Sequence, residues 1–121
     1  MPTDKLIYVA TLSKDLISLL KINKSTIKIY RSKGLLAHLL KRQHYKAAKY
    51  IDYLSDIIEN PDYAGVTENQ IELVKKFKDN IFLSIKLDIS KQIYYVATVF
   101  DVSQAKIDSY CKSGRILKLD K

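Results

Sequence analysis

One segment of this sequence, residues 81–89, constrains the fold more than any other. Apolar residues occupy every second position there, and polar residues stand at positions 84, 86 and 88. Successive side chains of a β-strand point to opposite faces, so this pattern predicts a strand with one dry and one wet face. The following segment, Ile93 to Phe100, is apolar almost throughout and predicts a central strand covered on both faces.

The N-terminal half has a different period. Residues 5–11 and 26–30 have the composition of short strands, and Ser13 is placed to cap a short helix. Leu35 to Asn60 has the apolar spacing of helix, broken near His44-Tyr45. Pro61 ends this helical region, and Asp62 to Glu68 is expected to be a loop.

The C-terminal half completes the predicted fold. An antiparallel meander runs from about Gln70 to Phe100, Asp101 or Ser103 caps a last helix, and Arg115 to Leu119 adds a short edge strand. We therefore expect an α+β fold in which N-terminal helices pack on a roughly four-stranded antiparallel sheet, with a short C-terminal helix. Residues 1–121 are expected to form a single domain.

The chain carries a large excess of positive charge. Lys and Arg total 21 against 13 Asp and Glu, which gives a formal net charge of +8. Such an excess favours polyanionic partners, with nucleic acid ahead of an anionic membrane surface or an acidic inhibitor protein.

Several function classes are disfavoured by what the sequence lacks. Cys111 is the only cysteine, and two histidines without further ligands make a poor metal site, so we expect no metal and no cofactor. Three glycines leave no loop that cradles phosphates. No apolar run approaches the length of a membrane span, and the N-terminus lacks the layout of a signal peptide, so we expect a cytoplasmic protein.

A cluster near position 40 holds the residue types that RNA cleavage needs. His38, Lys41, Arg42 and Tyr45 share one face of a continuous helix, and His44 follows three residues after Lys41. Transesterification needs a base for the 2′-hydroxyl, a cation for the phosphorane and an acid for the 5′-oxygen. Imidazole suits the first or the last task, and Lys or Arg suits the second. A solvated basic face with histidines at its ends is the simpler alternative.

The predicted strands offer further candidates, each with a structural alternative. Lys75 shares the side of the apolar strand residues around it, and Lys76 faces outward, where either can contact a phosphate or simply end a strand. Tyr63 is expected either to stack on a base or to cover the helix end. Tyr94 and Thr98 are predicted to share one strand face, opposite Tyr95, with the Thr98 hydroxyl available to a phosphate or to a cross-strand tyrosine.

Five short motifs in this order resemble a known family. They are Ala37-His38-Leu39-Leu40-Lys41-Arg42-Gln43-His44, Asn60-Pro61-Asp62-Tyr63, Glu72-Leu73-Val74-Lys75, Tyr95-Val96-Ala97-Thr98 and Ser113-Gly114-Arg115. In order and spacing, from about Lys5 onward, they look like the phage-associated nuclease-like domains of the Barnase–EndoU–colicin–RelE superfamily. The resemblance agrees with helices packed on an antiparallel sheet.

The resemblance implies a metal-independent RNA endonuclease that cleaves by 2′-hydroxyl transesterification, of the kind found in toxins, phage defence or phage cargo. RNA, with transfer RNA as one candidate, would be the substrate, and an acidic immunity or antitoxin protein a second partner. The alternative is a non-catalytic basic module of a mobile element that binds nucleic acid or an acidic partner. The expected catalytic residues are His38, His44, Arg42, Lys75 and Thr98. The expected substrate-binding residues are Lys41, Tyr63, Lys76, Tyr94 and Arg115.

Overall fold

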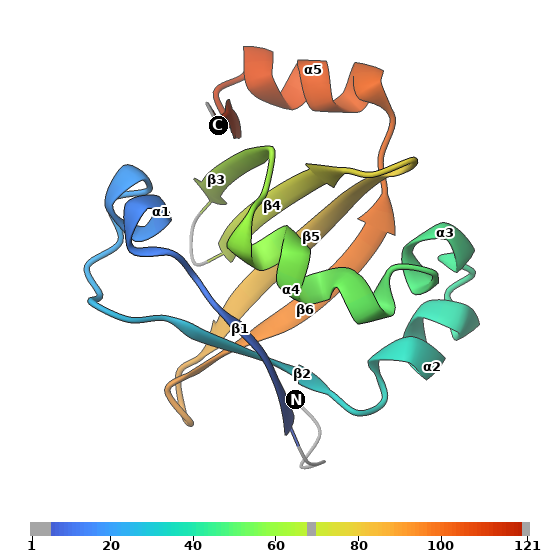
Figure 1. Cartoon of the computed structure of the whole chain (residues 1–121), viewed down its shortest axis with the longest axis horizontal. Coiled ribbons are helices and arrows are strands. Elements are labelled where there is room, and N and C mark those ends of the chain that lie inside the picture. The colour runs from blue at the N-terminus through green and yellow to red at the C-terminus, as the bar shows by residue number, and fades with distance from the viewer. Residues whose placement is uncertain (1–5, 68–69, 120–121) are drawn as a thin grey trace.

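The protein is built on one mixed β-sheet. The computed structural model describes residues 6–67 and 70–119, which form a seven-stranded sheet in the order β1-β2-β6-β5-β4-β3-β7 (Figure 1). Neighbouring strands are antiparallel except β2 and β6, which are parallel. The strands are β1 (Leu6–Thr11), β2 (Lys28–Ser32), β3 (Tyr63–Thr67), β4 (Gln70–Lys76), β5 (Asn80–Asp88), β6 (Ile93–Asp101) and β7 (Leu117–Lys118).

Short helices connect and cover these strands. They are α1 (Lys14–Leu19), α2 (Leu35–Lys41), α3 (Tyr45–Ala48), the 3-10 turn η1 (Ile51–Tyr53), α4 (Leu54–Glu59) and α5 (Gln104–Lys112). The two serine caps predicted from the sequence are confirmed, because Ser13 accepts a hydrogen bond from the Leu16 amide and Ser103 from the Lys106 amide, each at 3.1 Å. Such caps satisfy amides that have no partner inside the helix.

The two faces of the sheet are covered very differently. Ile71, Leu83 and Ile85 point to the side where α1 to α4 pack, and they belong to the main hydrophobic core. We call this side the helix-covered face. The other side carries the side chains of Glu72 and Ser84, and α5 packs on it. We call this side the open face. A smaller cluster under α5 covers only one end of the open face (Figure 1).

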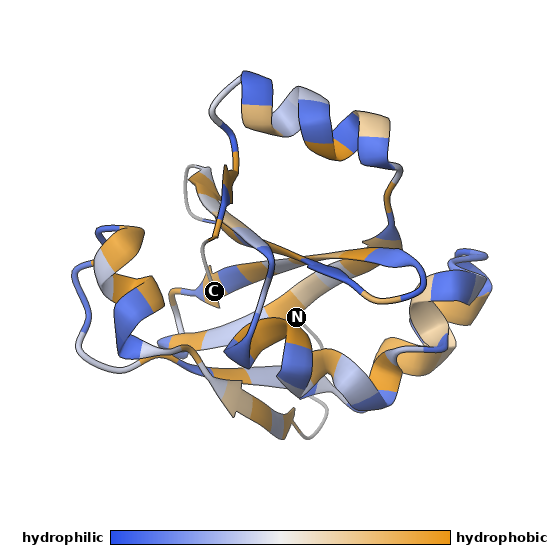
Figure 2. Cartoon of the chain, turned by 45° about the horizontal axis from the view of Figure 1, so that its top comes forward, coloured by the Kyte–Doolittle hydropathy of each residue, from blue (hydrophilic) through white to orange (hydrophobic). Residues whose placement is uncertain are grey.

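Hydropathy along the chain follows this division. Apolar and polar segments alternate along the strands, and α5 is largely hydrophilic (Figure 2). Its one buried residue among those described is Ile107. Ile107 packs with Val74 and Phe82, and Phe100 of β6 packs against the same cluster, so α5 covers one end of strands β3 to β6. Beyond this cluster, the open face carries exposed residues such as Lys86, whereas Glu72 and Ser84 are buried.

The predicted four-stranded antiparallel sheet is wrong. The structure has seven strands in a mixed sheet. Its helices alternate with strands along the sequence and do not all precede the strands. The two N-terminal segments that look like strands join the C-terminal meander through the parallel pair of β2 with β6. Residues 63–67, expected as a loop, form β3 and pair with β4. The pairing of β2 with β6 is non-local, so local periodicity does not reveal it, whereas β3 pairs with the next strand along the chain, with Thr67 opposite Gln70. The short C-terminal helix is confirmed as α5, and the assignment of residues 1–121 to one domain stays a prediction.

The predicted break near His44 is confirmed and has a clear cause. Helix α2 stops at Lys41, and Gln43 adopts a left-handed conformation with φ of 63°. A non-glycine residue in this region ends a helix, because the following residues leave its axis. Tyr45 therefore does not continue the face of His38, Lys41 and Arg42, as a continuous helix would require.

A β-bulge in β6 changes which residues share a face. Thr98 pairs with Ser84, and Val96 pairs with Ile85, so Ala97 is the extra residue. The extra residue reverses the alternation, since one added position moves later side chains to the other face. Thr98 consequently lies with Tyr95 on the open face, whereas Tyr94 points to the helix-covered face. The prediction that Tyr94 and Thr98 share a face is wrong.

Candidate functional site

A row of polar residues crosses the open face beside the cluster under α5. The strand register places Glu72 of β4 opposite Ser84 of β5, and Ser84 opposite Thr98 of β6. Directly paired residues of neighbouring strands point to the same face, so these side chains lie in one line. Three polar side chains in one line, two of them buried, form the first candidate for chemistry.

One end of this row is an ion pair between the buried Glu72 and the partly exposed Arg115. The Glu72 side chain is 0% exposed, and Arg115 donates to both of its oxygens, from Nε to Oε1 at 2.7 Å and from Nη2 to Oε2 at 2.6 Å. Gln70 Nε2 donates to Oε2 at 2.6 Å, and the Thr67 hydroxyl donates to Oε1 at 3.3 Å. A carboxylate removed from water is tolerated when such partners replace its hydration.

The backbone of the C-terminal segment fixes the arginine in place. A Cβ at Gly65 would come within 2.0 Å of the Arg115 carbonyl oxygen, so only glycine allows this close crossing of β3. The guanidinium carbon lies 4.3 Å from the centroid of the Tyr110 ring and 5.9 Å from that of Phe82. The hydrogen bonds with Glu72 are the largest cause that raises the pKa of Arg115 above its usual value. With 36% of its side chain exposed, Arg115 still reaches the surface.

The hydroxyl next to this pair has no partner. Ser84 is 1% exposed, and its Oγ atom makes no hydrogen bond to any described residue. An unsatisfied buried hydroxyl costs about 1–3 kcal/mol, so proteins seldom keep one without a reason. Ser84 stands between Glu72 and Thr98, and its Oγ atom is closed off from solvent, so a ligand reaches it only when neighbouring side chains move.

A cavity lies beside this row, and Glu72 is the member of the row that lines it. It has a volume of about 450 Å³ and is lined by Thr67, Gln70, Glu72, Lys86, Leu87, Tyr95 and Arg115. Lys86 and Arg115 supply positive charge, and Glu72 supplies the acceptor between them. Such a combination fits a phosphodiester, because cations bind its charge while a carboxylate takes a proton.

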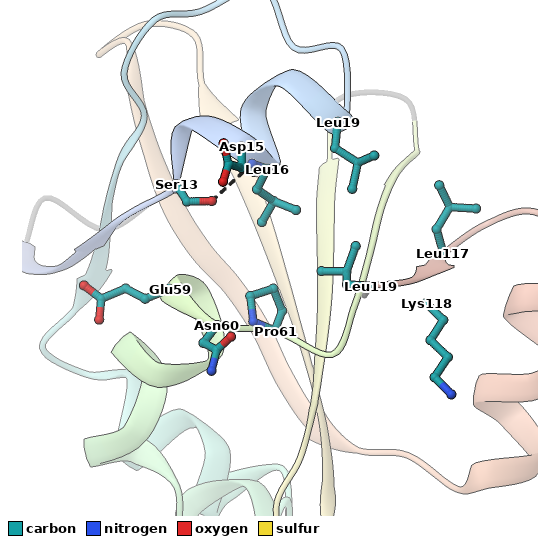
Figure 3. Close-up of a pocket in the computed structure, with 10 residues that line it drawn as sticks. All are labelled: Ser13, Asp15, Leu16, Leu19, Glu59, Asn60, Pro61, Leu117, Lys118 and Leu119. Carbon is teal, nitrogen blue, oxygen red and sulfur yellow. Dashed lines mark hydrogen bonds between the residues drawn. The ribbon is translucent and has the colours of Figure 1, made fainter. Parts of the chain in front are cut away.

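A second cavity is larger but chemically less suited to a phosphate. It has a volume of about 490 Å³ and lies between α1, the end of α4 and β7 (Figure 3). It is lined by four leucines, and its charged residues include the carboxylates Asp15 and Glu59. The leucines are Leu16, Leu19, Leu117 and Leu119. Two carboxylates against Lys118 disfavour an anion, so we place the candidate site on the open face.

Only some of the residues predicted for the site lie on the open face. Thr98 and Arg115 lie on the open face, as described above. His44 lies at the edge of the same face, since its ring centroid is 6.4 Å from that of Phe100, two residues along β6 from Thr98. His38 and Lys41 on α2, and Arg42 directly after it, are exposed and line none of the cavities described here.

The remaining predicted residues are placed elsewhere. Lys75 points to the helix-covered face and donates to the Asn60 carbonyl at 2.8 Å, where it neutralises the end of α4. Tyr63 is 6% exposed beneath α5. Lys76 is exposed at the end of β4, and Tyr94 packs against the main core. Their functional roles stay predictions.

The sequence interpretation did not single out Glu72, Ser84 or Lys86 as site residues. A signal for Glu72 was present, because an acidic residue interrupts the apolar run of Ile71 to Val74. A charged residue within a buried strand is normally paired and marks a special position. Its partner Arg115 is 43 residues away, and no local pattern connects the two.

The described residues show two further absences. No group of three or more His, Cys, Asp or Glu side chains in residues 6–67 and 70–119 is arranged to hold a metal ion. Among the same residues, no helix is both long and apolar enough to cross a membrane.

The chain matches a known family of nuclease-like domains. The family model described as phage-Barnase-EndoU-ColicinE5/D-RelE like nuclease3 matches residues 7–109. This range contains Glu72, Ser84 and Thr98 and ends before Arg115. No curated protein and no solved structure matches the sequence significantly.

Proposed function

We propose that this chain, which belongs to the phage-Barnase-EndoU-ColicinE5/D-RelE like nuclease3 family, is an RNA endonuclease that cuts its substrate on the open face of the sheet. Family membership confirms the resemblance predicted from the sequence and makes nucleic acid the substrate class. The observation that carries the proposal is the buried Glu72–Arg115 pair beside the unpartnered hydroxyl of Ser84. It supplies a base and a cation without any added group.

In this proposal Glu72 is the base. The hydrogen bond from Thr67 is the longest of its contacts at 3.3 Å, so the 2′-hydroxyl of a nucleotide replaces Thr67 at Oε1. Glu72 then takes the proton, and the 2′-oxygen attacks the phosphorus. Arg115 and Lys86 stabilise the negative charge that develops on the phosphorane. The hydroxyls of Ser84 and Thr98 donate hydrogen bonds to the phosphate oxygens.

The leaving 5′-oxygen needs a proton, and His44 is the better placed of the two histidines. It contacts Phe100 at the edge of the open face, whereas His38 is exposed on α2. The products are a 2′,3′-cyclic phosphate and a 5′-hydroxyl. Transfer RNA as the target, an acidic immunity protein and a cytoplasmic location stay predictions from the sequence.

A fluorescently labelled RNA incubated with the purified protein in EDTA tests this mechanism. Wild type should release fragments that end in a 2′,3′-cyclic phosphate and should leave the 2′-O-methyl form intact. Glu72→Gln should lose about a hundredfold or more of kcat/KM, and His44→Ala should lose more activity than His38→Ala. Lys75→Ala, on the other face, is the control and should cleave like wild type. No cleavage by wild type, or equal activity of Glu72→Gln, contradicts the proposal.

One observation favours a second function, binding without chemistry. Both oxygens of Glu72 already accept two hydrogen bonds each, which is also what a purely structural ion pair would show. A binding module would hold RNA with an affinity that falls steeply with salt, because neutralised phosphates release counterions. It would leave the RNA intact in the assay above.

A further inference from the structure

Three tyrosines continue the open face away from the ion pair. The register pairs Tyr8 of β1 with Tyr30 of β2, and Tyr30 with Tyr95 of β6. Tyr95 in turn pairs with Lys86 of β5, which pairs with Gln70 of β4. Paired residues point to the same side, so the tyrosines lie on the face that carries Glu72. We call Tyr8, Tyr30 and Tyr95 the tyrosine row.

The rings of this row are accessible and held in place. Tyr8 is 52% exposed, and Tyr30 and Tyr95 are partly exposed. Tyr8 and Tyr30 meet edge to face, with ring centroids 5.8 Å apart and an angle of 73° between the rings. The Tyr8 and Thr11 hydroxyls are 2.6 Å apart, which restrains the Tyr8 ring further. The cluster under α5 includes none of these three residues.

Positive charge lies at both ends of the Tyr30–Tyr95 pair. Tyr95 lines the cavity that contains Lys86 and Arg115. Tyr30 lines a separate cavity of about 270 Å³ together with Lys24 and Lys28. The pair therefore links two cavities that each hold two cations. Neighbouring strands lie about 5 Å apart, so the row from Tyr95 to Tyr8 spans roughly 10 Å.

We propose that the tyrosine row binds the unpaired bases of the RNA strand whose phosphate lies at Glu72, an inference that rests on the proposed function. Bases stack on the rings of Tyr95, Tyr30 and Tyr8, and the backbone passes Lys86 and then Lys24 and Lys28. Aromatic rings bind every base because each base has a flat π-face. Paired bases hide those faces inside the helix, so the substrate class is single-stranded RNA.

The structural alternative is a set of cross-strand contacts that only stabilises the sheet. Cross-strand aromatic pairs do contribute, at about 0.2–1 kcal/mol each. The two explanations differ in what they predict for binding. Removal of an exposed ring that only stabilises β1 and β2 lowers the melting temperature and leaves RNA affinity unchanged once the protein is folded.

The test measures the anisotropy of a labelled 2′-O-methyl RNA of mixed sequence, as a single strand and as a duplex. The 2′-O-methyl group removes the nucleophile, so binding is read without cleavage. The variants are Tyr8→Ala, Tyr30→Ala and Tyr30→Phe. The matched control is Tyr53→Ala, because Tyr53 is 50% exposed in η1 and contacts Tyr50 and Phe77 away from the tyrosine row. Melting curves check that every variant is folded at the assay temperature.

We expect the single strand to bind at least about tenfold more tightly than the duplex, and Tyr30→Ala to weaken it by about tenfold. Tyr30→Phe, which keeps the ring, and Tyr53→Ala should stay within about twofold of wild type. Equal affinity for duplex and single strand overturns the inference, and so does unchanged affinity in both Tyr8→Ala and Tyr30→Ala. If the wild type binds RNA through the tyrosines but cuts none, the result supports RNA binding by the tyrosine row and contradicts the proposed nuclease activity. Cleavage combined with unchanged affinity in both alanine variants contradicts the tyrosine row alone.

Discussion

The two faces of the sheet use the same strands for different purposes. Leu83 and Ser84 are neighbours on β5 and are almost equally buried, at 0% and 1% exposed. Leu83 packs into the core with the helices α1 to α4, whereas Ser84 lies between a buried ion pair and a threonine, with an unpartnered hydroxyl. Burial on the helix-covered face contributes stability, and burial on the open face includes groups that cost stability. This difference is typical of a surface kept for a ligand.

The largest effect should come from the helix-covered face. Leu83→Ala removes a fully buried side chain from the main core and should lower the free energy of unfolding by roughly 4 kcal/mol. Urea denaturation measures this loss. Cleavage per folded molecule should remain near wild type, because Leu83 points away from Glu72. A Leu83→Ala protein that stays folded but loses its cleavage activity would contradict this distinction between the two faces.

The Glu72–Arg115 pair should give the next largest effect. Glu72→Gln should cost about 3 kcal/mol of stability, the lower end for a broken buried pair, because Arg115 keeps part of its contact with water. A double-mutant cycle with Arg115→Gln, followed by urea denaturation, measures the coupling. The double variant should lose clearly less than the sum of the two single losses. Additive losses would mean that the two groups do not depend on each other.

Gly65 tests how the arginine is positioned. Gly65→Ala places a Cβ within 2.0 Å of the Arg115 carbonyl oxygen, so the C-terminal segment must move. We expect a loss of about 2 kcal/mol together with reduced cleavage. Gly34→Ala is the control, because its Cβ would meet only the Ser32 hydroxyl at 3.5 Å. Similar losses in both variants would argue against the close crossing as the cause.

Ser84 gives the smallest change in stability and the sharpest contrast with Leu83. Ser84→Ala removes a buried hydroxyl without a partner and should raise the free energy of unfolding by about 1 kcal/mol. The same change should slow RNA cleavage, because a hydrogen-bond donor to the phosphate is lost. Ser18→Ala, at an exposed position of α1, should change neither property. Unchanged cleavage in Ser84→Ala would remove Ser84 from the site.

Most local features of the fold were predictable from the sequence, although β3 was expected as a loop, and long-range features were not. The caps Ser13 and Ser103 and the alternating strand β5 depend on neighbours within a few residues, so their patterns are visible in the sequence. The pair of β2 with β6 joins Tyr30 to Tyr95 across 65 residues, and nothing local specifies it. As a result, the predicted sheet was too small.

The site was harder to predict for the same physical reason. Thr98 and Arg115 were predicted as site residues and lie on the open face, but Glu72, which lies near both, is reached only through strand pairing and the crossing at Gly65. The extra residue in β6 also moved Thr98 to the face opposite Tyr94. The histidines near position 40 were predicted as catalytic residues because their spacing is local. The helix that would have aligned them ends at Lys41.

Photo-crosslinking of single-stranded RNA that contains 4-thiouridine tests the central claim most directly, namely that nucleic acid binds the open face. Mass spectrometry of the digested complex identifies the attached residues. The account predicts attachment at Tyr30, Lys86 and Tyr95 on the open face. Attachment confined to the exposed residues of α2 and α3, such as Arg42 and Tyr45, would contradict it.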